Sequence, residues 1–184
     1  PSDMKPERFN SLIIASDTAF KAKSTSDYSV MITMGLDQSG DIYLVDLIRE
    51  RFEFPELKRK MIQLNNLWRG KGLRGIYIED KASGQSLIQE LRNQSGMSVL
   101  PVKVGSDKVS RLNAVLPLIE GGRVYLPNSA LWLDSFMDEA QSFPSGKHDD
   151  QIDALSMGLE AIAKMGGTAS ELLTGPINMA SSLS

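Results

Sequence analysis

Two acidic residues far apart in the chain each close a short apolar run, and this pattern constrains the fold most strongly. Asp17 follows the largely apolar residues 12–16, and Glu79 follows the apolar residues 75–78. Runs of this length are typical of buried strands. A helical pattern at residues 55–68 lies between them, and a strand reached through a helix usually pairs parallel to an earlier strand. We therefore expect the two strand ends to lie side by side, which would bring Glu79 near Asp17.

A third acidic cluster opens a helical pattern. Residues 148–155 read His-Asp-Asp-Gln-Ile-Asp-Ala-Leu, and apolar residues at positions 152, 155, 159 and 162 share one helical face. Carboxylates that converge in space repel one another unless a cation neutralises them. Mg²⁺ and Mn²⁺ prefer hard oxygen ligands, and two such ions can stabilise the attacking water and the leaving oxygen of a phosphodiester. The acidic pattern therefore favours metal-dependent phosphodiester hydrolysis.

The composition is that of an ordinary globular domain. The 184 residues, 41% of them hydrophobic, suffice for one domain with a substantial core. The absence of cysteine excludes disulfides and thiolate metal sites. No apolar run approaches membrane-spanning length and no signal-peptide pattern opens the chain, so we expect a cytoplasmic protein without membrane contact. The net charge of -3 argues against nucleic-acid binding through overall charge, unless basic residues gather on one surface.

The order of the elements predicts an α/β domain with a mixed, five-stranded central sheet flanked by helices. Strands are expected at residues 12–17, 28–34, 42–48, 75–79 and 99–104, and helices at residues 55–68, 83–91, 109–119, 131–143 and 150–162. The short connection between the second and third strands favours an antiparallel hairpin, and Pro101 places the fifth strand at an edge of the sheet. We expect residues 1–10 to be a linker from a longer polypeptide, residues 11–165 to form the folded domain, and residues 166–184 to be a flexible tail.

Three motifs in this order resemble a known family. They are Asp-Thr-Ala at residues 17–19, Tyr-Ile-Glu-Asp-Lys-Ala-Ser-Gly at residues 77–84, and the acidic cluster at residues 148–155. With the order of elements, they resemble the ribonuclease H-like superfamily, and most closely the C-terminal nuclease domain of the large terminase subunit of tailed bacteriophages. The resemblance spans roughly residues 11–165.

The resemblance implies a two-metal endonuclease that cuts concatemeric viral DNA during genome packaging in the host cytoplasm. The partners it implies are double-stranded DNA, an N-terminal ATPase motor domain, the portal protein and the small terminase subunit. The sequence contains no G-x-x-x-x-G-K-[ST] phosphate loop, so the motor is not expected within these residues.

The resemblance also implies the roles of the acids. Asp17 would bridge two Mg²⁺ or Mn²⁺ ions, Glu79 would hold one of them, and Asp150 would complete the catalytic site. Glu79 and Asp80 compete for the middle position, because neighbouring strand residues point to opposite faces. We favour Glu79, which sits closest to the strand end. Asp153, on the same side of a helix as Asp150, is either a further metal ligand or a partner of one.

Several basic residues flank the acidic motifs or the predicted elements and are candidates for phosphate contacts. They are Lys21, Lys23, Lys81, Lys108, Arg111, Lys147 and His148. An ordinary surface position is the alternative for each of them.

Three functions remain open at this point. The first is a DNA endonuclease, and the second is a Holliday-junction resolvase or RNA–DNA hybrid nuclease of the same fold. The third is a noncatalytic docking module, because acids in a first helical turn also interact favourably with the helix dipole.

Overall fold

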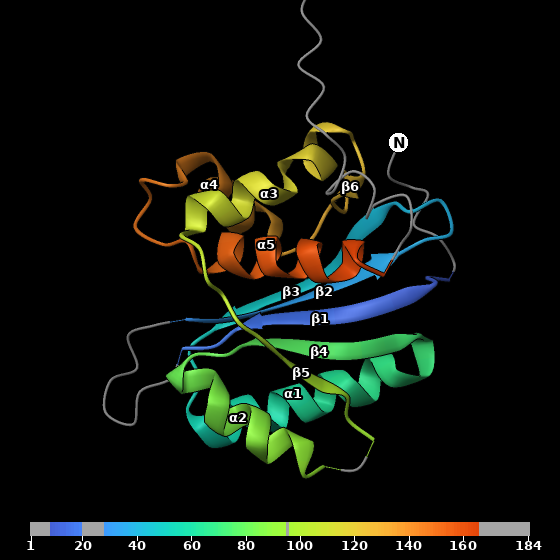
Figure 1. The fold of residues 1–184 in the computed structure, drawn as a ribbon, viewed down its shortest axis with the longest axis vertical. Helices are drawn as coiled ribbons and strands as arrows, with labels where there is room; N and C mark the ends of the chain where they lie inside the picture. The colour runs from blue at the N-terminus through green and yellow to red at the C-terminus, as the bar shows by residue number, and fades with distance from the viewer. Residues whose placement is uncertain (1–7, 20–27, 95, 166–184) are drawn as a thin grey trace, which may run out of the picture.

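The computed structural model describes residues 8–19, 28–94 and 96–165, which form a central mixed sheet with helices on both faces (Figure 1). The strands are β1 (Ser11–Asp17), β2 (Ser29–Leu36), β3 (Ile42–Glu50), β4 (Leu73–Glu79), β5 (Val99–Val102) and β6 (Val124–Tyr125). The helices are α1 (Phe54–Trp68), α2 (Ala82–Arg92), α3 (Lys108–Glu120), α4 (Leu133–Ser142) and α5 (Asp150–Ala163), with a 3-10 turn, η1 (Arg69–Lys71). None of the helices in these ranges is both long and apolar enough to cross a membrane. Residues 1–7 of the predicted linker at residues 1–10 lie outside the described residues, as does the predicted tail at residues 166–184.

The sheet has the order β5-β4-β1-β2-β3-β6. β2 pairs antiparallel with β1 and with β3, whereas β4 pairs parallel with β1 and with β5. The predicted hairpin, the predicted parallel pairing of β1 with β4 and the edge position of β5 are thus confirmed. The prediction of five strands was one too few, because β6 pairs with Ile42 and Tyr43 of β3. A strand of two residues is too short for its side-chain alternation to distinguish it from an extended loop.

The chain reaches β4 through a helix whose ends are marked by special residues. Pro55 stands in the first turn of α1, where its missing N–H costs no hydrogen bond. Gly72 follows η1 with a φ of 100°, a left-handed conformation that favours glycine. The chain turns there and enters β4 beside β1, and this return creates the parallel pair on which the candidate site depends.

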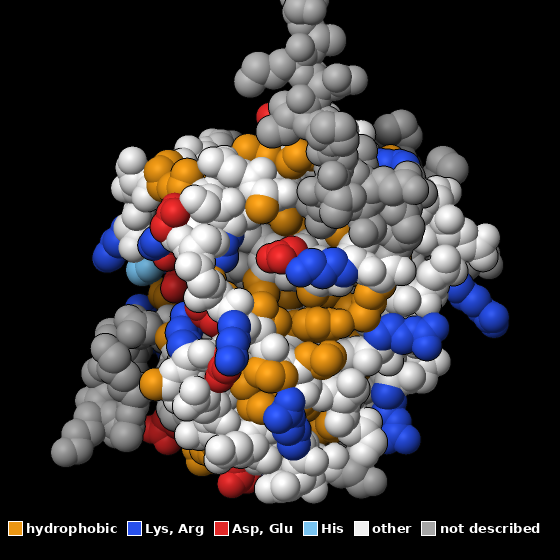
Figure 2. Space-filling view, viewed as in Figure 1, with side chains coloured by type: hydrophobic (Ala, Val, Ile, Leu, Met, Phe, Trp, Pro, Cys, Tyr) orange, Lys and Arg blue, Asp and Glu red, His pale blue; other side chains and the backbone are white. Residues whose placement is uncertain are grey.

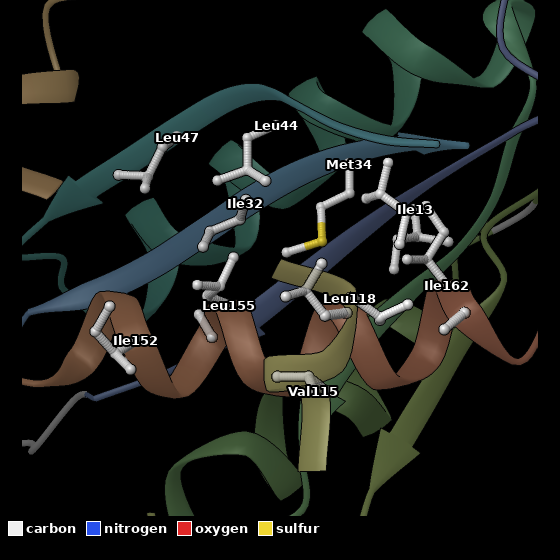
Figure 3. Packing of buried hydrophobic residues seen from close by; sticks show 14 of the residues in the cluster. Ile13, Ile32, Met34, Leu44, Leu47, Val115, Leu118, Ile152, Leu155 and Ile162 are labelled. Carbon is white, nitrogen blue, oxygen red and sulfur yellow. The ribbon is translucent and has the colours of Figure 1, made fainter. Parts of the chain in front are cut away.

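Two apolar clusters hold the helices to the sheet. α1 and α2 pack on one face through residues that include Leu57, Met61 and Leu87, and α3, α4 and α5 cover the other (Figure 1). Figure 3 shows the second cluster, in which Ile152, Leu155 and Ile162 of α5 meet the side chains of β1, β2 and β3. The arrangement makes α5 the central helix of its face.

α5 lies unusually close to the sheet at one glycine. A Cβ atom added to Gly158 would lie 2.8 Å from the Cβ of Ala15 on β1 and 2.5 Å from the Cε of Met34 on β2. The other side of α5 is covered by α3 and α4, so almost every residue from Gln151 to Leu159 is buried. The start of α5, which carries the third acidic cluster, is therefore fixed relative to the strand ends.

Candidate active site

Asp17 and Glu79 end two neighbouring parallel strands. In the pairing of β1 with β4, Ser16 lies opposite Ile78, so the next residue of each strand reaches the same end of the sheet. Asp17 is buried, with only 5% of its surface exposed, and Glu79 is half-buried. We call these two carboxylates the strand-end pair.

Lys81 joins the two members of the strand-end pair. Its Nζ lies 2.6 Å from Oδ1 of Asp17 and 2.6 Å from Oε2 of Glu79. Lys81 is the N-cap residue of α2, so the turn from β4 into α2 directs the ammonium group back over the strand ends. The two carboxylate oxygens therefore flank one position of positive charge.

Burial controls the protonation of Asp17. Burial raises its pKa from 3.8 to about 7, the Lys81 ammonium opposes this rise, and the neighbouring Glu79 carboxylate adds to it. Burial alone would lower the pKa of Lys81, but the two carboxylates outweigh it and raise that pKa above its ordinary value. A cation at this position thus stabilises two carboxylates that are costly to keep charged side by side.

A close contact between α2 and β4 fixes the position of Glu79. A Cβ atom on Gly84 would lie 2.1 Å from the backbone oxygen of Glu79. This distance is too short for any residue with a side chain to be accommodated without a shift of the backbone. The glycine therefore lets the first turn of α2 lie directly against the end of β4. Its backbone N–H donates to the carbonyl oxygen of Lys81, which holds the turn together.

Asp80 directly follows the last residue of β4. Its backbone N–H donates to the carbonyl oxygen of Val102, so the extended pairing with β5 continues through this residue. The backbone N–H of Lys81 donates to the carbonyl oxygen of Glu79, so the chain turns at Asp80 toward α2. Glu79 is the residue whose carboxylate shares the Lys81 ammonium with Asp17.

Asp150 is the first residue of α5 and has a different set of neighbours. Its Oδ2 lies 3.7 Å from Nη2 of Arg49, on β3. Burial, then the carboxylate of Glu139, raises the pKa of Asp150, and the guanidinium of Arg49 and the ring of His148 oppose that rise. We call Asp150 the helix-start acid.

Glu139 of α4 holds the start of α5, and the sequence analysis did not identify it. One carboxylate oxygen accepts hydrogen bonds from the backbone N–H groups of Gln151 at 2.6 Å and Ile152 at 3.2 Å, and the other accepts one from Nε2 of Gln151 at 2.8 Å. Glu139 therefore satisfies N–H groups that a helix leaves free in its first turn. Its spacing of three residues from Phe136 places it on the apolar face of α4, which was the available signal that this acid is buried.

Asp153 and Asp149 are paired with α3. Oδ1 of Asp153 lies 2.6 Å from Nη2 of Arg111, and Asp149 contacts Lys108. Two of the predicted phosphate contacts therefore form ion pairs with the acidic cluster instead of standing free. Lys147 and His148 line a cavity beside Arg49, and Lys21 and Lys23 lie outside the described residues.

The predicted acids lie at one end of the sheet. Figure 2 shows acidic and basic side chains gathered on the left of the molecule, where β1 ends and α5 begins in Figure 1. Among the residues that the structure describes, no three His, Asp or Glu side chains are grouped closely enough to hold one ion. Each carboxylate instead has a side-chain cation, Lys81 at the strand-end pair and Arg49 at the helix-start acid. The carboxylate oxygens of Asp17 and Glu79 are ligands of the kind that a hard divalent ion prefers. They already lie on either side of one positive charge, the Lys81 ammonium.

Comparison with known proteins identifies the family. Residues 14–161 match the family model of the terminase RNaseH-like domain. The large terminase of one thermophilic bacteriophage superposes with a TM-score of 0.64 at 16% identity, over 85% of this chain and 41% of that one. The large terminase nuclease of a thermophilic phage named G20c superposes with a TM-score of 0.61 at 23% identity, over 82% and 81% of the two chains. The terminase nuclease domain of human cytomegalovirus superposes with a TM-score of 0.61 at 13% identity, over 89% of this chain and 87% of that one.

These matches establish a fold and a family. The described chain spans less than half of the first of these large terminases, and no curated protein sequence matches it. The solved structures share its ribonuclease H-like fold, as the order of the elements predicts. Since the family model covers most of the chain, the chain belongs to the family of terminase RNase H-like domains.

Proposed function

We propose that this chain is a divalent-metal-dependent DNA endonuclease that cuts concatemeric viral DNA during genome packaging. The observation that carries the proposal is the strand-end pair, in which the carboxylates of Asp17 and Glu79 each lie 2.6 Å from the ammonium nitrogen of Lys81. Membership of the terminase RNase H-like family supports the same activity. In the proposal, Asp17, Glu79 and Asp150 are the residues that hold Mg²⁺ or Mn²⁺.

The side chains of this chain prepare such a site in three ways. Lys81 keeps the strand-end pair together at its present spacing. The tight packing of Gly84 against Glu79 fixes the carbonyl end of β4, and Glu139 fixes the first turn of α5, on which Asp150 stands. Two bound divalent ions would supply the charge that stabilises an attacking water and a leaving oxygen. The residues themselves supply the rigid oxygen donors.

The proposal narrows the predicted ligand set. Asp153 stays a candidate ligand or partner of one, because its ion pair with Arg111 is of the same length as that of Asp17 with Lys81. Glu79 is preferred to Asp80, because the carboxylate of Glu79 shares the Lys81 ammonium with Asp17. Double-stranded DNA is the proposed substrate. The ATPase motor domain, the portal protein and the small terminase subunit are the proposed partners, in the host cytoplasm.

Cleavage of supercoiled plasmid in Mg²⁺ or Mn²⁺ tests the activity. We expect the wild type to nick and linearise the plasmid, and we expect Asp17→Asn and Asp150→Asn to lose at least about 100-fold in rate, comparable to the loss of a critical metal-site residue. Glu120→Gln is the matched control, because it removes an exposed carboxylate at the far end of α3. Equal cutting by the wild type and both variants would reject the proposed site.

Substrate comparison separates the alternative nucleases of the same fold. Linear duplex, a four-way junction and an RNA–DNA hybrid would be offered at equal concentration. Preference for the junction or the hybrid would replace the packaging function with a resolvase or hybrid nuclease. A noncatalytic docking module would cut none of them and would bind no divalent ion through its carboxylates.

A further inference from the structure

A tyrosine, two arginines and a histidine form a second cluster of side chains near Asp150. The guanidinium carbon of Arg49 lies 3.8 Å from the ring centre of Tyr28, and that of Arg51 lies 4.3 Å from the same ring centre. His148 meets Tyr28 edge-on, with the ring centres 5.7 Å apart. We call Tyr28, Arg49, Arg51 and His148 the arginine–tyrosine cluster.

The strand register places this cluster on the same face and at the same end of the sheet as the strand-end pair. Asp17 pairs with Val30, and Val30 pairs with Arg49 on its other side. Paired residues point to the same face, so Asp17 and Arg49 stand in one row, two strand spacings or roughly 10 Å apart. Tyr28 directly precedes β2 and Arg51 directly follows β3, so both lie two residues beyond this row, at the same end of the sheet. A chain of phosphates that passes Asp17 would therefore pass the arginines.

Arg49 has hydrogen-bond donors to spare. Its guanidinium face is occupied by Tyr28, which leaves the in-plane N–H groups as its free donors. Within the part of the chain that the structure describes, its buried Nε and Nη2 have no hydrogen-bond partner. The nearest carboxylate oxygens lie at 3.8 Å on Glu139 and 3.7 Å on Asp150, beyond ordinary hydrogen-bond distance.

An open cavity gives a ligand access to two members of the cluster, Arg49 and His148. It has a volume of about 290 Å³ and is lined by Arg49, Lys147 and His148, together with Ser135 and Ser142. Two acids, Asp138 and Glu139, also line it. The charge of Glu139 is already engaged by N–H groups of α5, and Asp138 is exposed to solvent. The remaining groups are two cations, Arg49 and Lys147, the imidazole of His148 and two hydroxyls, which suit an anion with several oxygen acceptors.

We propose that the arginine–tyrosine cluster, with Lys147, binds a backbone phosphate of nucleic acid beside the cleavage site. A phosphate offers the planar pair of acceptor oxygens that a guanidinium fork matches. A contact of this kind positions a strand without reading its bases. The identity of the ligand as DNA rests on the proposed function, whereas the phosphate chemistry rests on the cluster alone.

Equilibrium binding of a fluorescent DNA duplex in EDTA tests this site without any cleavage. The wild type, Arg51→Gln and Arg59→Gln would be titrated from about 50 to about 200 mM salt, and their thermal unfolding compared. Arg51 is exposed, and Arg59 is an equally exposed arginine on α1, on the opposite face of the sheet. Removal of one phosphate contact should lower the slope of log K against log salt concentration by about 0.9 in Arg51→Gln. Arg59→Gln should keep the wild-type slope.

Arg49→Lys adds a second variant that keeps the charge but loses the fork. It should bind more weakly than the wild type with an unchanged salt slope. Wild-type binding by both Arg51→Gln and Arg49→Lys would overturn the site, as would a wild type that binds no duplex. Inorganic phosphate, titrated into the protein without DNA, separates the sources of the ligand: phosphate binding that Arg51→Gln abolishes, together with duplex binding that Arg51→Gln leaves unchanged, would indicate a free-phosphate site and overturn the assignment to a DNA backbone.

The two proposals fail in different ways. A protein that cuts plasmid but whose Arg51→Gln and Arg49→Lys variants both bind duplex like the wild type keeps its nuclease function and loses this site. A protein that binds duplex through the cluster but cuts nothing supports the site and loses the proposed nuclease function.

Discussion

The strand-end pair and the helix-start acid lie at the same end of the sheet but are positioned in opposite ways. Asp17 and Glu79 stand on neighbouring parallel strands, and their counter-charge, Lys81, follows Glu79 by two residues. Asp150 instead depends on groups from α4 and β3 that are distant in the chain.

This difference shows how one site combines contacts between residues close in the sequence with contacts between distant ones. The strand-end pair is built by backbone pairing, so its geometry persists as long as the sheet does. The position of the helix-start acid depends on the buried carboxylate of Glu139, because Glu139 accepts hydrogen bonds from the backbone N–H groups of the two residues that follow Asp150. We therefore expect the two regions to fail differently under substitution and under a change of pH.

The largest expected effect concerns the pH dependence of stability at the strand-end pair. The folded chain raises the pKa of Asp17 from 3.8 to about 7, so between these values the folded state keeps a proton that the unfolded state has released. The free energy of unfolding should therefore fall as pH rises from about 4 to about 7, by roughly 4 kcal/mol from this residue. Urea unfolding of the wild type and Asp17→Asn at several pH values measures the difference. Parallel pH profiles for the two proteins would contradict this account.

The next effect concerns the helix-start acid. Glu139→Ala would leave the N–H groups of Gln151 and Ile152 without an acceptor in a buried position, at a cost of about 3 kcal/mol. We expect plasmid cleavage to fall by about 10- to 100-fold, as for other residues that orient a metal ligand. Glu139→Gln keeps an acceptor oxygen and should recover much of the stability. Full activity in Glu139→Ala would show that Asp150 needs no support from α4.

The smallest of these effects tests how closely Glu79 depends on its backbone. Gly84→Ala would force its Cβ against the backbone oxygen of Glu79, at a cost of about 2 kcal/mol, and would displace the end of β4. The matched control is Gly70→Ala, because a Cβ on Gly70 meets nothing within 4 Å. Thermal unfolding and plasmid cleavage should both decline in Gly84→Ala alone. Equal behaviour of the two variants would mean that α2 can move away from β4 without consequence.

The sequence predicted the strand-end region well because its determinants are local. Apolar runs, a helical period between them and the rule for parallel crossovers suffice to bring the end of β4 beside β1. Strand alternation predicts only that one of Glu79 and Asp80 faces Asp17, and the preference for Glu79 as the metal ligand stays a prediction. The role of these residues in metal binding stays a prediction.

The surroundings of Asp150 could not be predicted in the same way. Arg49 and Glu139 meet Asp150 only after β3, α4 and α5 have packed together, and no spacing in the sequence encodes that contact. The ion pairs of Lys108 and Arg111 with the acidic cluster were missed for the same reason, because α3 and α5 are separated by a strand and a helix.

Calorimetric titration of Mn²⁺ into the metal-stripped protein tests the central claim, that both regions contribute to one metal site. We predict that the wild type binds Mn²⁺ and that Asp17→Asn and Asp150→Asn each weaken binding by at least about 10-fold, while Glu120→Gln does not. Wild-type affinity and stoichiometry in Asp150→Asn would contradict the claim and separate the helix-start acid from the strand-end pair.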